Sequence, residues 1–266
     1  MKNLPNLFTL LNLIFGCLAI VFVLQTGTSI VALDNSGNTE LVLPERLWLG
    51  GLFIFGAAVI DFLDGFLARI MKAQSEMGKQ LDSLSDVVSF GVAPSIILYQ
   101  MLRMSYAREE NGLDVSMVAL LPAFILAAAA AWRLAKFNIS TNQGESFRGV
   151  PSPAAGLVVA SLPLILWYPH YDTVGEVFLN KWFLYAIILL LSYLMVCNRS
   201  FMAMKFKEYS FRNNQLKYLL VLLAVTSIIF FQWLSVPIIF VLYLLVSIFP
   251  ARTSTTTSRE QLDITV

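Results

Sequence analysis

Four aspartates between residues 61 and 86 are the side chains best suited to chemistry. Asp61 and Asp64 are three residues apart, and Asp82 and Asp86 are four apart. Each spacing places its two carboxylates on one face of a helix. A break between the two pairs allows the second helix to fold back against the first, so that all four acids meet. The sequence therefore predicts an acidic site between two neighbouring helices.

The composition indicates that these helices lie in a lipid bilayer. The chain has 266 residues, of which 58% are hydrophobic and only 13% are charged. Soluble domains carry roughly 25% charged residues, so this composition is typical of a polytopic membrane protein. The net charge of +1 gives no reason to expect a nucleic-acid partner.

Carboxylates at membrane depth require something that offsets their charge. Each costs about 2.5 to 3.5 kcal/mol on insertion scales, so four would cost on the order of 10 kcal/mol. Two divalent cations would balance four negative charges, and oxygen ligands without histidine or cysteine favour Mg²⁺ or Mn²⁺ over zinc. The alternative is that the acids are solvated helix ends, or ion-pair partners of Arg69, Lys72 and Lys79. Four acids on matched faces favour the metal site.

The elements that must position these acids are predicted from apolar runs. About eight transmembrane helices in an all-α bundle are expected, over residues 6–25, 45–72, 80–104, 115–138, 151–169, 180–197, 216–233 and 236–250. The last two are joined only by Leu234 and Ser235, which makes them a hairpin. Residues 1–250 are expected to form one catalytic domain, and the polar residues 251–266 a disordered cytoplasmic tail.

The distribution of Lys and Arg predicts the orientation of the bundle. With the N-terminus in the cytoplasm, fourteen basic residues fall on the inner side and four on the outer side. The four aspartates then lie at the cytoplasmic ends of the second and third helices. Soluble substrates and Mg²⁺ are available on that side of the membrane.

The acidic stretch resembles the signature of the CDP-alcohol phosphotransferase family. The pattern D-x-x-D-G-x-x-A-R-x8-G-x-x-x-D-x-x-x-D is matched at every fixed position. Members of this family are integral membrane enzymes that transfer a phosphatidyl or similar group from a CDP-linked donor to an alcohol, releasing CMP. The resemblance implies that Asp61, Asp64 and Asp82 hold two metal ions, that Asp86 lies near the metals as general base, and that the protein is a homodimer.

Three further segments narrow this resemblance to the bacterial membrane-embedded phosphatidylserine synthases. They are residues 85–94, 133–138 and 147–156. The narrower resemblance implies CDP-diacylglycerol and L-serine as substrates and the bacterial cytoplasmic membrane as the location. Glycerol phosphate or inositol phosphate is the alternative acceptor, and either would call for a more basic pocket.

A cation transporter is the alternative from a different class of protein. Intramembrane acids line ion pathways in some transporters. Such a pathway needs polar residues across the whole bilayer, whereas the outer halves of these helices are almost purely apolar. The sequence therefore favours an enzyme.

Small and polar residues near the acids are candidates for binding the nucleotide donor. Small side chains let phosphates approach a helix backbone, although they also let helices pack tightly. Arg69 would contact a donor phosphate, pair with Asp64 or extend to the membrane interface. Polar side chains of the first helix would line the nucleotide site or hydrogen-bond neighbouring helices. These donor-site candidates are Gly65, Ala68, Arg69, Gly78, Asn6 and Thr9.

Basic residues further along the chain are candidates for binding the acceptor. Arg133 and Lys136 are three residues apart and face one way at the inner end of the fourth helix. Together with Arg148 they would bind the carboxylate of an amino acid, or a donor phosphate. Ordinary anchoring by basic residues at the inner membrane surface is the alternative. Lys136 stands where Arg is more usual in the family, which argues against a bidentate clamp there.

Overall fold

A computed structural model describes residues 4–24, 31–33, 39–41, 46–71, 75–109, 115–139, 147–168, 172–201 and 215–248. The tail predicted at 251–266 lies outside these residues. So does Lys72, one of the candidate ion-pair partners of the acids.

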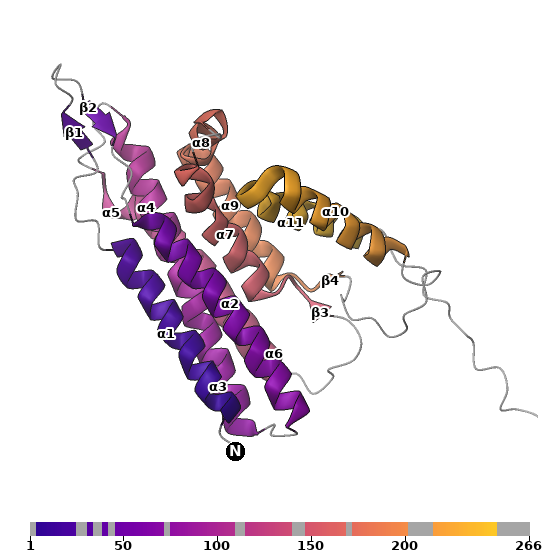
Figure 1. The fold of residues 1–266 in the computed structure, drawn as a ribbon. Coiled ribbons are helices and arrows are strands. Elements are labelled where there is room, and N and C mark those ends of the chain that lie inside the picture. The colour runs from indigo at the N-terminus through magenta and orange to yellow at the C-terminus, as the bar shows by residue number, and fades with distance from the viewer. Residues whose placement is uncertain are drawn as a thin grey trace, which may run out of the picture.

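The described residues form eight apolar helical segments, as predicted. Figure 1 shows how they are arranged. Predicted and observed boundaries differ by at most four residues. The segments are α1 (Leu4–Leu24), α2 (Leu47–Ile70), α3–η1–α4 (Glu76–Asp86, Val87–Val92 and Ala93–Ala107), α5–η3–α6 (Met117–Leu120, Leu121–Phe124 and Ile125–Ile139), α7 (Ser152–Trp167), α9 (Lys181–Val196), α10 (Gln215–Phe231) and α11 (Ser235–Ile248). The all-α polytopic bundle is confirmed.

Within the described ranges, five helical stretches are long and apolar enough to cross a membrane, namely Pro5–Leu24, Leu47–Ile70, Glu76–Ala107, Met117–Ile139 and Tyr218–Ser247. The last stretch is broken by the short 3₁₀ helix η5 (Gln232–Leu234), whose first residue has a φ of 43°. The break separates α10 from α11, which pack against each other as the predicted hairpin. The apolar helices α7 and α9 are shorter.

Some elements were not predicted. A short helix, α8 (Asp172–Phe178), precedes α9. The strands β1 (Val31–Leu33) and β2 (Thr39–Leu41) pair antiparallel within a segment expected to be loop. The strands β3 (Phe147–Arg148) and β4 (Ser200–Phe201) also pair antiparallel, and they bring the start of α7 next to the end of α9.

The segment α3–η1–α4 runs through the middle of the bundle, where α1, α6 and α7 contact it. Its central part, η1, is a π-helix that begins directly after Asp86. Small residues let its neighbours approach closely: a Cβ on Gly156 of α7 would lie 3.1 Å from the Cα of Phe90. π-Helical turns are rare and occur frequently at functional sites. This one lies at the end of the acidic stretch.

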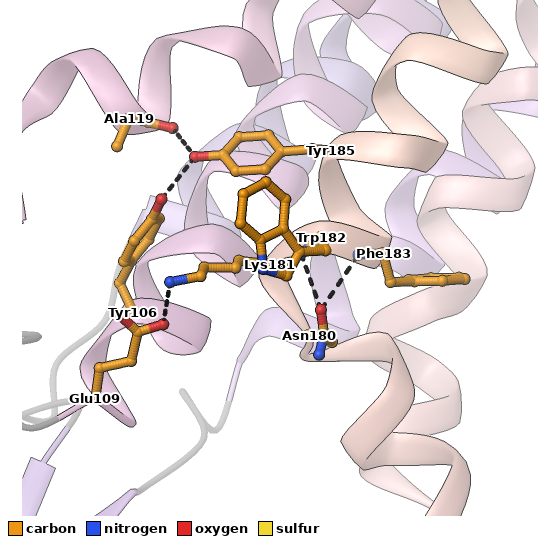
Figure 2. A network of polar contacts seen from close by, with 8 residues as sticks. All are labelled: Tyr106, Glu109, Ala119, Asn180, Lys181, Trp182, Phe183 and Tyr185. Atoms are coloured by element: carbon orange, nitrogen blue, oxygen red, sulfur yellow. Dashed lines mark hydrogen bonds and ion pairs between the residues drawn. The ribbon is translucent and has the colours of Figure 1, made fainter.

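A polar network ties α4, α5 and α9 together at the end of the bundle far from the N-terminus (Figures 1 and 2). The hydroxyl oxygens of Tyr106 and Tyr185 lie 2.9 Å apart, and Tyr185 donates to the carbonyl oxygen of Ala119 at 2.6 Å. Lys181 forms an ion pair with Glu109 at 2.5 Å. We call this region the tyrosine end. It contains none of the predicted site residues.

Candidate active site

Three of the four predicted acids converge at the opposite end of the bundle. Asp61 and Asp64 come from the last turns of α2, and Asp82 comes from α3, which follows α2 after a short connection. One carboxylate oxygen from each of these three residues lies within 4.8 Å of the other two. Asp64 is only 5% exposed. The helical spacing of the two pairs thus produces the expected cluster.

Asp86 lies beside this cluster and is also buried, with 7% of its surface exposed. Its carboxylate is close enough to Asp61 and Asp82 to interact with both electrostatically. Asn12 of α1 donates a hydrogen bond from Nδ2 to Asp86 Oδ1 at 3.5 Å. We call the region around these four aspartates the acidic end.

No basic side chain forms an ion pair with these acids among the residues that the structure describes. The ion pair that the described residues do form joins Lys181 to Glu109, at the tyrosine end. Arg69 is exposed and donates from Nε to the carbonyl oxygen of Gly65, in its own helix, at 2.9 Å. Asp64 Oδ2 is buried and has no hydrogen-bond partner in the part of the chain that the structure describes. Three converging carboxylates without a basic partner among the described residues fit a hard divalent cation such as Mg²⁺ or Mn²⁺.

Helix α1 is fastened to the acidic end by hydroxyl groups of the central segment. Ser85 Oγ donates to the carbonyl oxygen of Thr9, and Ser89 Oγ donates to that of Asn12, each at 3.0 Å. Thr9 is buried, and its side chain lies next to the carboxylate of Asp64. The polar residues of α1 therefore pack against a neighbouring helix and also border the acids.

The small residues of the signature lie in different surroundings. A Cβ on Gly78 would lie 2.9 Å from Asn6 Oδ1 and 3.1 Å from Ser75 Oγ, so this glycine lets α1 and α3 approach each other. A Cβ on Gly65 would meet no atom beyond its own stretch of helix within 4 Å among the described residues. Ala68 is half-buried. Helix packing explains Gly78, whereas Gly65 borders open space next to Asp64.

The three acceptor candidates are not all brought together. Arg133 is close enough to Asp86 to interact with it electrostatically, and its Nη1 donates to Ser152 Oγ at 3.1 Å. Lys136 is exposed and donates to Asn198 Oδ1 at 2.5 Å. The backbone of Arg148 lies in β3, and its side chain is outside the described part of the chain.

Two asparagines lie at the acidic end, and only Asn138 had no predicted role. Asn12 was expected, with Asn6 and Thr9, to line the nucleotide site or to hydrogen-bond a neighbouring helix, and it does bond to Asp86 of α3. Asn138 of α6 donates from Nδ2 to Ser83 Oγ at 2.8 Å. No spacing within its own helix connects Asn138 with Ser83, because the two residues are 55 positions apart in the sequence.

Comparison of the sequence with known proteins shows which family the chain belongs to. A sequence model described as CDP-alcohol phosphatidyltransferase matches residues 2–194. The chain belongs to this family. The match extends from α1 into α9 and includes all four aspartates. The family resemblance inferred from the aspartate spacing is therefore confirmed.

Several relatives within the family share a name. A CDP-diacylglycerol–serine O-phosphatidyltransferase of Helicobacter pylori is 32% identical over 247 residues, which are 92% of this chain and 89% of the relative. A Bacillus subtilis protein with the same name is 32% identical over 162 residues, which are 61% of this chain and 76% of the relative. An archaetidylserine synthase of Methanothermobacter thermautotrophicus is 30% identical over 167 residues, which are 62% of this chain and 59% of the relative.

Proposed function

We propose that this protein transfers the phosphatidyl group of CDP-diacylglycerol to the hydroxyl group of L-serine and releases CMP, as a step of phospholipid biosynthesis. The observation that carries the proposal is the convergence of Asp61, Asp64 and Asp82 within 4.8 Å without a basic partner among the described residues. This cluster lies in a chain that is similar over 92% of its length to a bacterial CDP-diacylglycerol–serine O-phosphatidyltransferase.

The acidic end is proposed to hold two divalent cations, Mg²⁺ or Mn²⁺, on Asp61, Asp64 and Asp82, with Asp86 also near them. Bound there, such ions would neutralise the pyrophosphate of the donor and the charge that develops on the departing CMP. The buried, unpartnered oxygen of Asp64 supports this assignment because an unpaired carboxylate oxygen is costly to bury.

Asp86 is proposed as the general base. A serine hydroxyl is a weak nucleophile at neutral pH, so loss of its proton during attack lowers the barrier. Asp86 takes that proton while the serine oxygen forms a bond to the phosphatidyl phosphorus. The bond from that phosphorus to CMP breaks, and its electron pair leaves with CMP. The hydrogen bond from Asn12 helps to orient the carboxylate of Asp86.

The donor is proposed to bind along α1, α2 and α3. The open space next to Gly65 supports close approach of the pyrophosphate to the backbone of α2. Arg69 would contact a donor phosphate at the exposed edge of the site. The other donor-site candidates are Asn6, Thr9, Ala68 and Gly78.

Arg133 is proposed to bind the carboxylate of serine, with Lys136 and Arg148 as further acceptor contacts. Arg133 is close enough to Asp86 to interact with it electrostatically, which supports a place beside the reacting groups. A guanidinium binds a carboxylate well, and the similarity to a CDP-diacylglycerol–serine O-phosphatidyltransferase supports serine over glycerol phosphate or inositol phosphate.

The location and assembly of the protein follow from the same proposal. We expect an integral protein of the bacterial cytoplasmic membrane, with the acidic end on the cytoplasmic side where serine is available. The excess of Lys and Arg on that side supports this orientation. A homodimer is expected from the family resemblance.

CMP release by the detergent-purified protein tests the proposal. The assay supplies CDP-diacylglycerol, Mg²⁺ or Mn²⁺, and either serine, glycerol 3-phosphate or inositol phosphate. We expect release with serine. Release with a phosphorylated acceptor alone would overturn the choice of acceptor, and the absence of release with all three would overturn the enzymatic proposal.

A further inference from the structure

Asn138, near the end of α6, uses its hydrogen-bond donor and leaves its acceptor unpaired. Its Nδ2 donates to Ser83 Oγ at 2.8 Å, and Ser83 Oγ donates to the carbonyl oxygen of Lys79 at 3.1 Å. A serine hydroxyl has one proton, so Ser83 accepts from the NH₂ group of Asn138. This chain of hydrogen bonds fixes the orientation of the amide. Asn138 Oδ1 is then a buried acceptor without a partner among the described residues.

The hydrogen bond to Ser83 places Asn138 at the flank of the acidic end. Ser83 lies between Asp82 and Asp86 on α3. Arg133, five residues before Asn138, lies about 7.5 Å further along the axis of α6, at a rise of about 1.5 Å per residue. Both side chains nevertheless reach α3, because Asn138 bonds to Ser83 and Arg133 interacts electrostatically with Asp86.

Arg133 also has an unused group. Its Nη1 is occupied by Ser152, whereas its Nε is buried without a hydrogen-bond partner among the described residues. A buried polar atom without a partner loses the hydrogen bonds that water would give it, so it favours a ligand that supplies them. Helix α6 thus offers a ligand two unpaired groups: the Nε–H donor of the Arg133 guanidinium and the neutral acceptor Oδ1 of Asn138.

We propose that Asn138 determines specificity for an amino-acid acceptor by accepting a hydrogen bond from its α-ammonium group. This inference rests on the proposed function, in which Arg133 binds the carboxylate. The charged groups of a zwitterion match the two unused groups on α6. A phosphorylated polyol carries no ammonium group and would leave Asn138 Oδ1 unpaired.

Comparison of serine with 3-hydroxypropanoate, which has the same hydroxyl and carboxylate but no ammonium group, tests the proposal. The measured quantity is kcat/KM for each acceptor, from CMP release. For Asn138→Leu we expect kcat/KM with serine to fall on the order of 10- to 100-fold, the usual effect of losing a hydrogen bond to a charged group. With 3-hydroxypropanoate we expect kcat/KM to change less than about threefold, because the lost contact is absent there.

Two variants serve as controls. Asn138→Asp keeps the size of the side chain and an accepting oxygen, so it should retain the preference for serine. Asn180→Leu makes the same change as Asn138→Leu at the tyrosine end, where Asn180 caps α9, and should leave the preference as in the wild type. An unchanged KM for CDP-diacylglycerol shows that the donor site of each variant is intact.

The possible outcomes are distinct. An equal loss with both acceptors, or an unchanged preference in Asn138→Leu, would overturn the role of Asn138 and leave the proposed function standing. If Asn138→Leu does not fold, Ser83→Ala removes the anchor of the amide and must lower the preference in the same direction, or the inference fails. A wild-type protein without serine-dependent CMP release would instead overturn the proposed function.

Discussion

The acidic end and the tyrosine end contrast in how their polar groups are paired. At the tyrosine end, Glu109 has Lys181, and the two tyrosine hydroxyls bond to each other and to a carbonyl oxygen (Figure 2). At the acidic end, Asp64 Oδ2 and Asn138 Oδ1 are buried without partners among the described residues. Buried polar atoms in folded proteins are nearly always paired.

This difference in pairing suggests a structural role for the tyrosine end and a functional role for the acidic end. A polar network whose members are paired within the protein fastens helices together, as the tyrosine end does for α4, α5 and α9. A cluster of acids that has no basic partner among the described residues and keeps a buried, unpaired carboxylate oxygen is suited to bind ions or substrates. We therefore expect changes at the acidic end to affect activity and changes at the tyrosine end to affect stability.

The largest effect is expected from Asp86→Asn. An amide cannot take the serine proton, so kcat for CMP release should fall about 10²- to 10⁴-fold, the usual contribution of a general base. The KM for CDP-diacylglycerol should change little. Undiminished turnover in a variant that still binds donor and metal would show that Asp86 is not the base.

The next largest effects are expected from replacing Gly65 and Gly156 by alanine. Gly65→Ala adds a methyl group to the open space at the acidic end, where we expect it to raise the KM for CDP-diacylglycerol about tenfold. Stability should not fall, because alanine favours a helix by about 1 kcal/mol over glycine. Both quantities are measured on the purified protein, by steady-state kinetics and by thermal unfolding.

Gly156→Ala is the matched change in the packed interior. Its new methyl group would meet the backbone of Phe90, and such overpacking typically costs about 1 to 3 kcal/mol. We expect a lower unfolding temperature with an unchanged KM for the donor. Stability loss in Gly65→Ala, with the donor KM unaffected, would mean that Gly65 serves packing after all.

A smaller effect is expected from Tyr185→Phe at the tyrosine end. The change removes the hydrogen bonds to Ala119 and Tyr106, and a typical intramolecular hydrogen bond contributes about 0.5 to 1.5 kcal/mol. Thermal unfolding in detergent should show this loss, while kcat/KM for serine stays at the wild-type value. A fall in kcat/KM without loss of stability would contradict the division between the two ends.

The smallest effect is expected from Glu109→Gln. The ion pair with Lys181 is partly exposed, and solvent screens such pairs. We expect neither the unfolding temperature nor the rate of CMP release to change measurably. Loss of activity in this variant would give the tyrosine end a role in catalysis that its paired groups do not suggest.

The parts of the fold that depend on local sequence were predictable. Apolar runs located the eight helical segments because a membrane span must be long and apolar. The spacing of Asp61 with Asp64, and of Asp82 with Asp86, indicated one face of each helix because helical periodicity is local. Convergence of the two pairs followed from the short connection between α2 and α3.

Contacts between distant segments were not predictable from such patterns. Asn12 reaches Asp86 across 74 residues, and Asn138 reaches Ser83 across 55. The antiparallel pairing of β3 with β4 depends on a turn at Gly149, whose φ of 77° suits glycine, and on its N–H bonding to the carbonyl oxygen of Arg199. These features depend on how the helices pack against one another. The periodicity of residues within a single segment does not indicate that packing.

The dependence of serine-driven CMP release on divalent cation tests the central claim most directly. It is measured for the wild type, Asp64→Asn and Glu109→Gln under one set of conditions. We predict that release requires Mg²⁺ or Mn²⁺ in the wild type and in Glu109→Gln, and that Asp64→Asn, which disrupts the unpaired cluster, shows little or none. Release without divalent cation, or equal release from Asp64→Asn and the wild type, would contradict the account.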